Sequence, residues 1–214
     1  MVLSIEERIK GFLFSPSETF DASKEDTLGD SLTYFVAVLA IFAAIFGTFI
    51  AIYTGMWLSI FMSLITQIPG ASTSMPPFIG EIGPLIAMLL FVLFFIAVLI
   101  GGIIGAFIGG LWTHIWVFLV GGRKGVAQTI KAVMYGATPN LLLAFMPWAI
   151  IVQVIGIRQL QELSTGRAIL AAILAIIIPV ILFVVLFTAF VPSMLGPFPG
   201  QTFPGPTGPG FGGF

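Results

Sequence analysis

The chain has 214 residues, of which 58% are hydrophobic and only 8% charged, whereas soluble domains carry roughly 25% charged residues. This composition excludes a water-soluble globular fold, and the net charge of -1 leaves no basic excess for a nucleic-acid partner. The absence of cysteine excludes disulfides, thiolate nucleophiles and cysteine-bound metals.

Residues 1–30 form a polar head that holds seven of the nine acids and three of the eight bases. Apolar residues recur at helical spacing from Val2 to Leu13, with charges opposite them. Such an amphipathic helix either lies flat on the membrane or packs on the protein's own cytoplasmic face. The run Ser-Pro-Ser-Glu at 15–18 predicts a helix start, and residues 27–30 are a weaker version of it.

The first two membrane spans are predicted from charge-free stretches. No charge occurs between Ser31 and Gly80, and about 20 apolar residues cross a bilayer, so residues 32–53 are the first span and 66–80 a loop. The second stretch, 82–122, is either one over-length helix or two short ones. We favour one helix, because it places Arg123 and Lys124 on the side of the basic head.

The third and fourth segments, 128–145 and 148–163, are short and meet at a tight corner, Met146-Pro147-Trp148. They either cross the membrane or form a re-entrant hairpin, and both arrangements leave their ends on the same side. The fifth span is 168–191. The predicted fold is therefore an all-α integral membrane protein, a five-span helical bundle whose third and fourth segments could be re-entrant.

Charge predicts the orientation. With the head inside, all eight basic residues lie at or near cytoplasmic ends, as the positive-inside rule requires. We therefore expect a multi-pass protein of the cell membrane with a cytoplasmic N-terminus and an external C-terminus. Residues 1–30 are the cytoplasmic head, 31–192 the membrane domain, and 193–214 an external, disordered tail of Gly, Pro and Phe.

The sequence offers no catalytic constellation. It lacks common hydrolase, metalloprotease and phosphate-loop motifs, and Glu81 and Glu162 are the only acids after residue 30. The one histidine, His114, lies between two tryptophans and is expected to be an interfacial anchor. We expect no enzyme activity, no cofactor and no metal.

Polar residues gather in the third and fourth segments, where Pro139 frees a backbone carbonyl. They either satisfy that backbone or line a substrate or ion site. Arg158 and Glu162 are one helical turn apart and are expected to pair. The candidate polar patch comprises Lys131, Tyr135, Thr138, Asn140, Gln153, Arg158 and Glu162.

Small residues recur every four positions in the second span and predict a packing stripe: Ala97, Gly101, Gly105 and Gly109. Small residues let two helix backbones approach closely. The stripe is either a dimer interface or a seam with another span of the same chain, and we favour the second.

Several motifs together resemble the Yip family of Rab-interacting multi-span membrane proteins, in its prokaryotic branch. The resemblance covers about residues 8–190. The motifs are Phe14-Ser15-Pro16-Ser17-Glu18-Thr19-Phe20, Gly121-Gly122-Arg123-Lys124-Gly125, Gln128-Thr129-Ile130-Lys131, Tyr135-Gly136-Ala137-Thr138-Pro139, Gly156-Ile157-Arg158-Gln159-Leu160 and Leu163-Ser164-Thr165-Gly166-Arg167-Ala168.

The resemblance implies five helical spans, an internal N-terminus and an external C-terminus. A small-GTPase partner is not expected, because the head lacks the Asp-Leu-Tyr-Gly-Pro type of motif that eukaryotic relatives carry. We expect a non-enzymatic protein that organises membrane or partner proteins, with the lipid bilayer and a homo-oligomer or membrane-protein partner as its contacts. The alternative is a small oligomeric transporter or channel.

Overall fold

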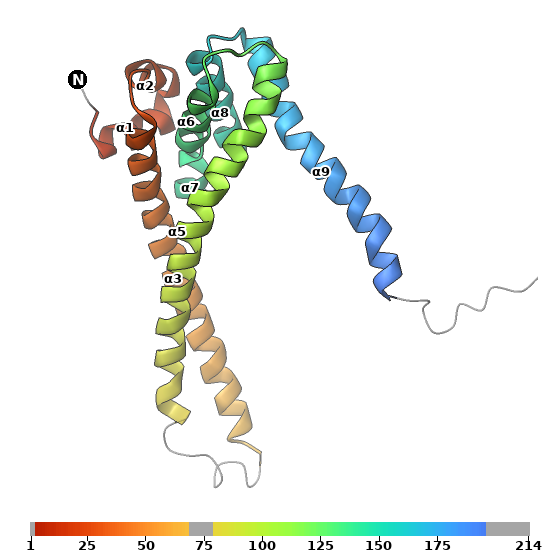
Figure 1. Cartoon of the computed structure of the whole chain (residues 1–214). Coiled ribbons are helices and arrows are strands. Elements are labelled where there is room, and N and C mark those ends of the chain that lie inside the picture. The colour runs from red at the N-terminus through yellow and green to blue at the C-terminus, as the bar shows by residue number, and fades with distance from the viewer. Residues whose placement is uncertain (1–2, 69–78, 196–214) are drawn as a thin grey trace, which may run out of the picture. The chain divides into compact units, whose positions relative to one another are not determined.

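The structure is a computed structural model that describes residues 3–68 and 79–195 (Figure 1). These residues form helices and connecting loops, with no strand among them. The helices are α1 Ile5–Phe14, α2 Pro16–Ala22, α3 Leu28–Ile65, α5 Ile79–Leu119, α6 Val126–Gly136, α7 Thr138–Leu143, α8 Met146–Leu160 and α9 Thr165–Leu195. The predicted all-α class is confirmed.

Three helices are long and apolar enough to cross a membrane. They are α3, residues Gly83–Leu119 of α5, and residues Thr165–Val191 of α9. The 41 residues of α5 form one continuous helix, which confirms the preference for one long second span. In contrast, α6, α7 and α8 have 11, 6 and 15 residues, and each is shorter than the roughly 20 residues that a crossing needs.

The chain divides into two compact units, residues 1–175 and 176–214. The first contains α1 to α8 and the first residues of α9. The described part of the second unit continues α9 to Leu195, so the helix runs past the predicted end at residue 191. The rest of the predicted tail, 196–214, lies outside the described residues, as do most positions of the predicted loop 66–80.

Two helix starts carry complete capping boxes, in which side chain and backbone satisfy each other's donors. Thr27 and Asp30 form one at α3, and Ser4 and Glu7 form another at α1. The predicted start at Ser15 does begin α2, with proline in the first turn, but Ser15 makes no side-chain cap hydrogen bond. Of the two helix starts that the sequence predicted, the weaker one, at residues 27–30, therefore has the complete capping box.

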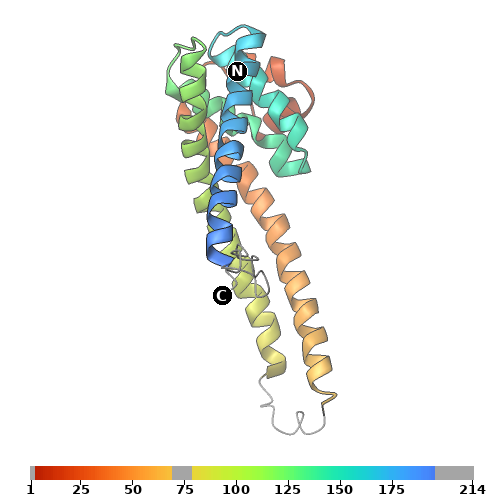
Figure 2. The ribbon, with the colours of Figure 1, turned by 90° about the vertical axis from the view of Figure 1, so that its right-hand side faces the viewer.

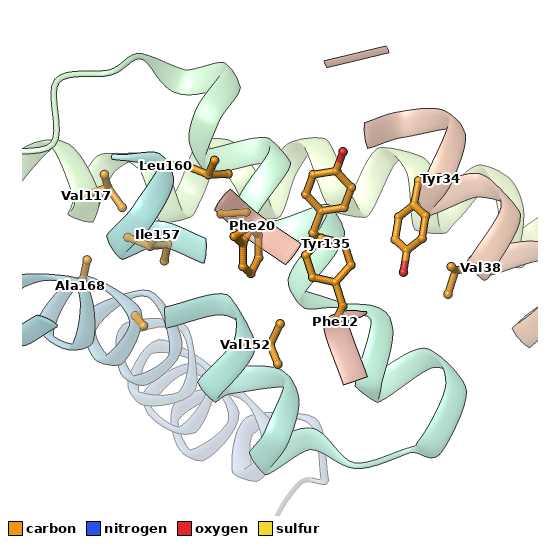
Figure 3. Packing of buried hydrophobic residues seen from close by; sticks show 13 residues of the cluster. Phe12, Phe20, Tyr34, Val38, Val117, Tyr135, Val152, Ile157, Leu160 and Ala168 are labelled. Atoms are coloured by element: carbon orange, nitrogen blue, oxygen red, sulfur yellow. The ribbon is translucent and has the colours of Figure 1, made fainter. Parts of the chain in front are cut away.

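The head packs on the protein rather than lying free on a membrane surface. Phe12 of α1 and Phe20 of α2 are both fully buried, and their rings meet edge to face with centroids 4.8 Å apart. Figure 3 shows both rings beside Tyr135 of α6. Trp148 Nε1 donates to the Leu13 carbonyl at 2.9 Å, which fixes the end of α1 against α8.

Long helices α3 and α5 lie side by side, as Figures 1 and 2 both show. Helix α5 packs on α3 and α6 through a small-residue face that is offset by one position from the predicted stripe. Gly102 faces Leu39 of α3, Ala106 is buried, and Gly110 faces Ile130 of α6.

The predicted stripe itself points away from these contacts. Ala97, Gly101 and Gly105 are exposed, and a Cβ added at Gly101, Gly105 or Gly109 meets no atom within 4 Å in the described structure. The preference for a seam within the chain is therefore wrong for these residues. One residue along a helix is a rotation of about 100°, so the face that packs is the next one. The intermolecular interpretation stays a prediction.

Candidate functional site

A buried ionic cluster joins the head to α6, and we call it the Asp26 cluster: Arg8, Asp26, Lys131 and Tyr135. Arg8 lies on the buried side of α1 and is only 4% exposed. Its guanidinium binds the Asp26 carboxylate through two nitrogens, with Nη1 2.8 Å from Oδ2 and Nη2 3.1 Å from Oδ1. Such a two-point contact fixes orientation as well as charge.

Tyr135 completes this pair from α6. Its hydroxyl donates to Asp26 Oδ2 at 2.5 Å and accepts from Arg8 Nη1 at 2.9 Å. The ring stacks on Phe12 with centroids 4.7 Å apart. The phenol proton therefore completes the hydrogen bonding of the Asp26 carboxylate.

Lys131 lies one turn earlier on α6. Its side chain binds backbone carbonyls of the loop between α2 and α3, the loop that contains Asp26. Its Nζ donates to the carbonyls of Lys24 and Asp26 at 3.0 and 2.7 Å, and the residue is 2% exposed. Together, Arg8 and Lys131 hold the segment between α2 and α3 against α6.

A second chain of hydrogen bonds ties α3 to the end of α6. Thr138 Oγ1 donates to the Tyr135 carbonyl at 2.8 Å. Because this uses its single proton, the 2.9 Å contact with Tyr34 has the tyrosine hydroxyl as donor. The carbonyl that Pro139 leaves free is therefore satisfied by the adjacent threonine. This supports the structural interpretation of these polar residues.

The Asp26 cluster leaves no described polar atom of its own without a partner. Buried side-chain atoms that lack a hydrogen bond in the described chain belong elsewhere: Ser23 Oγ, Trp116 Nε1, Gln128 Oε1 and Gln159 Oε1. A cavity of about 170 Å³ lies beside the cluster and is lined by Leu3, Ile5, Arg8, Asp30, Thr33 and Tyr34. The guanidinium of Arg8 that borders it is already occupied by Asp26, so the cavity offers no free charged group from the cluster.

Of the predicted polar patch, the structure brings together only Lys131, Tyr135 and Thr138. Asn140 is exposed and takes no part. Gln153 lies on α8 where its backbone approaches Gly136 closely, since a Cβ on that glycine would stand 2.9 Å from the Gln153 Cα. These two residues are therefore a surface position and a helix-packing position.

The predicted pair of Arg158 and Glu162 is wrong. The helix α8 ends at Leu160, and Glu162 has a left-handed φ of 53°, so the two residues do not share a helical face. Glu162 instead pairs with Lys124, with Oε2 and Nζ 2.6 Å apart and both side chains largely exposed. Among the described residues Arg158 makes no side-chain hydrogen bond or ion pair.

A second polar junction closes the α5–α6 loop onto the end of α8. Gln161 is buried; its Nε2 donates to the Gly125 carbonyl and to Thr129 Oγ1, and its Oε1 accepts from the Lys124 amide. His114 Nδ1 lies 2.9 Å from the same Thr129 hydroxyl. All of these contacts are internal, so the histidine belongs to a structural junction.

Sequence reasoning missed the two head residues at the centre of the site, Arg8 and Asp26. The helical spacing of residues 2–13 places Arg8 on the polar side of its helix, whereas the structure buries it, and no local pattern marks Asp26. The available signal was Lys131, a cation inside an apolar segment, since a buried charge requires a partner. The described residues hold no group of three or more histidines or acids that could bind a metal.

No protein-family model, curated protein or solved structure matches this chain. The class of protein therefore rests on the structure alone: an all-helical protein with three helices able to cross a membrane, and a helical head fastened to it by buried ionic contacts.

Proposed function

We propose that the chain is a non-enzymatic, multi-pass integral membrane protein of the Yip-like type, which organises membrane or partner proteins. In this proposal it resides in the cell membrane with its N-terminus in the cytoplasm and its C-terminus outside. The supporting observation is the Asp26 cluster, in which every charged group forms an ion pair or hydrogen bonds with another group of the same chain. Such a cluster clamps the head in one position and leaves a fixed surface for contact.

The alternative, a small transporter or channel, is favoured by the same buried charges, since ionisable groups in membrane proteins often mark ion pathways. A transport site, however, needs polar groups that exchange partners with the solute. In the described structure the Arg8 guanidinium is held at two points by Asp26, and the Asp26 carboxylate also accepts from Tyr135. This geometry favours the clamp.

Tyr135→Phe separates the two functions, because it removes one hydroxyl and keeps the buried ring. For a clamp, the variant leaves Asp26 short of a donor and lowers the free energy of unfolding by roughly 1–3 kcal/mol. Asn140→Ala, at an exposed position of the same predicted patch, is the matched control and keeps wild-type stability. The measurement is unfolding of the purified protein in micelles.

The same preparations are then sealed in vesicles with a pH-sensitive dye or a potassium-sensitive dye. The proposal expects wild-type protein to add no proton or potassium flux to that of empty vesicles. Wild-type flux that Tyr135→Phe abolishes without a change in stability would establish the transporter instead. Cross-linking in native membranes then tests for the organising role, with the chain expected in a discrete complex.

A further inference from the structure

Helices α6 and α7 form one arm of a hairpin and α8 forms the other. The tip of this hairpin, the corner between α7 and α8, is apolar and exposed. Leu143, Phe145 and Met146 are 58, 52 and 62% exposed. The opposite end of the hairpin carries the exposed Lys124–Glu162 ion pair. The hairpin is therefore polarised along its length, with charge at its root and apolar side chains at its tip.

The tip cannot reach across a bilayer. Two contacts fix the register of α6 and α7 on α3: Ser31 Oγ lies 3.7 Å from Met134 Sδ, and Tyr34 Oη lies 2.9 Å from Thr138 Oγ1. Both segments therefore advance in the same direction from the head. From Thr138 to Leu143 the helix α7 advances about 8 Å, and the two non-helical residues that follow add at most about 7 Å. The tip therefore lies no more than about 20 Å beyond the level of Ser31.

Ser31 is also where the charge-free stretch of α3 begins. A hydrocarbon core is about 30 Å thick and begins no earlier than Ser31 on α3, so a tip within about 20 Å of that level stops short of the far headgroups. At that depth the surrounding medium is acyl chain, which suits the exposed leucine, phenylalanine and methionine. In water the same side chains would form an unfavourable exposed apolar patch.

We propose that the α6–α8 hairpin is a wedge that enters only the leaflet on the side of the basic loops, with the acyl chains of that leaflet covering Leu143, Phe145 and Met146. Two packed helices, each about 10 Å across, then add cross-section to one leaflet and none to the other. This asymmetry favours bilayers curved with the wedged leaflet outermost. The inference rests on the proposed organising function and supplies a physical means for it.

The internal clamps keep the wedge at one depth. Trp148, the third residue of α8, donates to the Leu13 carbonyl of α1, and Gln159 near the other end of α8 donates to Ser17 Oγ at 2.8 Å. Together with the Asp26 cluster on α6, these bonds anchor both arms of the hairpin to the head. A hairpin fixed in this way displaces lipid instead of sliding out of the leaflet.

Depth is tested with single cysteines, for which the chain offers a clean background because it has none of its own. Phe145→Cys is compared with Ser164→Cys, in the loop between α8 and α9, and Gln67→Cys, beyond the far end of α3. In sealed vesicles the two controls label with an impermeant maleimide from opposite sides. Phe145→Cys is expected to stay unlabelled from both, and a nitroxide on it should report one-leaflet depth.

Labelling of Phe145→Cys from the Gln67 side would mean a full crossing, and labelling from the Ser164 side would place the tip in water; either result overturns the wedge. Curvature is tested by partition between small and large vesicles. Wild-type protein should be enriched on the small ones by roughly twofold or more, and Phe145→Ser should lose that enrichment. The control Ile104→Ser changes a residue of α5 that is exposed to a similar extent, 52%, and should keep it.

Absence of enrichment in the wild-type protein would also overturn the inference. It would leave the proposed organising function standing through partner proteins, because that function fails on the flux measurement and not on this one. Phe145→Ser should retain wild-type unfolding behaviour, since its side chain is half exposed. A loss of enrichment by this variant therefore reports on the lipid contact.

Discussion

Neighbouring glycines on α5 test whether the packing face is the one that the structure shows. Gly110 lies against α6, where an added Cβ would stand 2.7 Å from Ile130 Cγ1 and 3.1 Å from the Ile130 Cα. Gly109 is the next residue back on the same helix, and a Cβ there meets nothing within 4 Å of described structure. Gly109→Ala and Gly110→Ala therefore make the same chemical change in opposite surroundings.

The magnitudes follow from two opposing effects. Replacing glycine by alanine within a helix gains about 0.5–1 kcal/mol, because the unfolded chain loses conformational freedom. At Gly110 the new methyl group contacts backbone as well as side chain, so a side-chain rotation cannot relieve it, and α5 and α6 must separate by roughly half an ångström. Overpacking of this kind costs about 1–3 kcal/mol.

We therefore expect Gly110→Ala to destabilise the protein by about 1–2 kcal/mol and Gly109→Ala to leave it unchanged or slightly more stable. Reversible unfolding of the purified protein in mixed micelles, followed by helical circular dichroism, gives both free energies in one assay. Equal effects at the two positions, or greater damage at Gly109, would refute the assigned orientation of α5.

Two further predictions concern the polar contacts. A double-mutant cycle on Lys124 and Glu162 should give a coupling free energy of no more than about 1 kcal/mol that decreases in high salt, because the pair is exposed. The same cycle on Arg158 and Glu162 should give no coupling, so that the effects of Arg158→Ala and Glu162→Ala on the free energy of unfolding add. Hydrogen bonds to the Ser4 backbone and side chain hold the pKa of Glu7 below its ordinary value, so its stabilisation of α1 is full above the unfolded-state pKa and disappears as pH falls through the lowered one. An NMR titration of the Glu7 carboxyl should show that lowered midpoint, and Ser4→Ala should raise it; an unchanged midpoint in the variant would contradict the cap.

Composition and local pattern determined the parts of this protein that depend on neighbouring residues. The continuous helix α5 follows from a charge-free stretch whose basic end must lie with the basic head. The start of α3 follows from the capping pair Thr27 and Asp30. Both features are set by interactions within a few residues or by transfer of a whole segment into lipid. Both kinds of interaction can be predicted from the local sequence.

The packing face of α5 was decided only by tertiary structure. Glycines or alanines at 101, 105 and 109 and at 102, 106 and 110 form two stripes that differ by one residue. Both stripes allow close approach of a neighbouring helix, and no feature of the local sequence distinguishes them. The side chains of Leu39 on α3 and Ile130 on α6 select the second stripe.

The candidate site shows the same division. The three patch residues that the structure does bring together, Lys131, Tyr135 and Thr138, lie within eight residues of one another at the end of α6 and the start of α7. The sequence could not supply Arg8 and Asp26, whose contacts with Tyr135 span 127 and 109 positions. A charge in a polar head is compatible with either water or an ion pair, and only the folded arrangement of α1, α3 and α6 removes the water and leaves the pair.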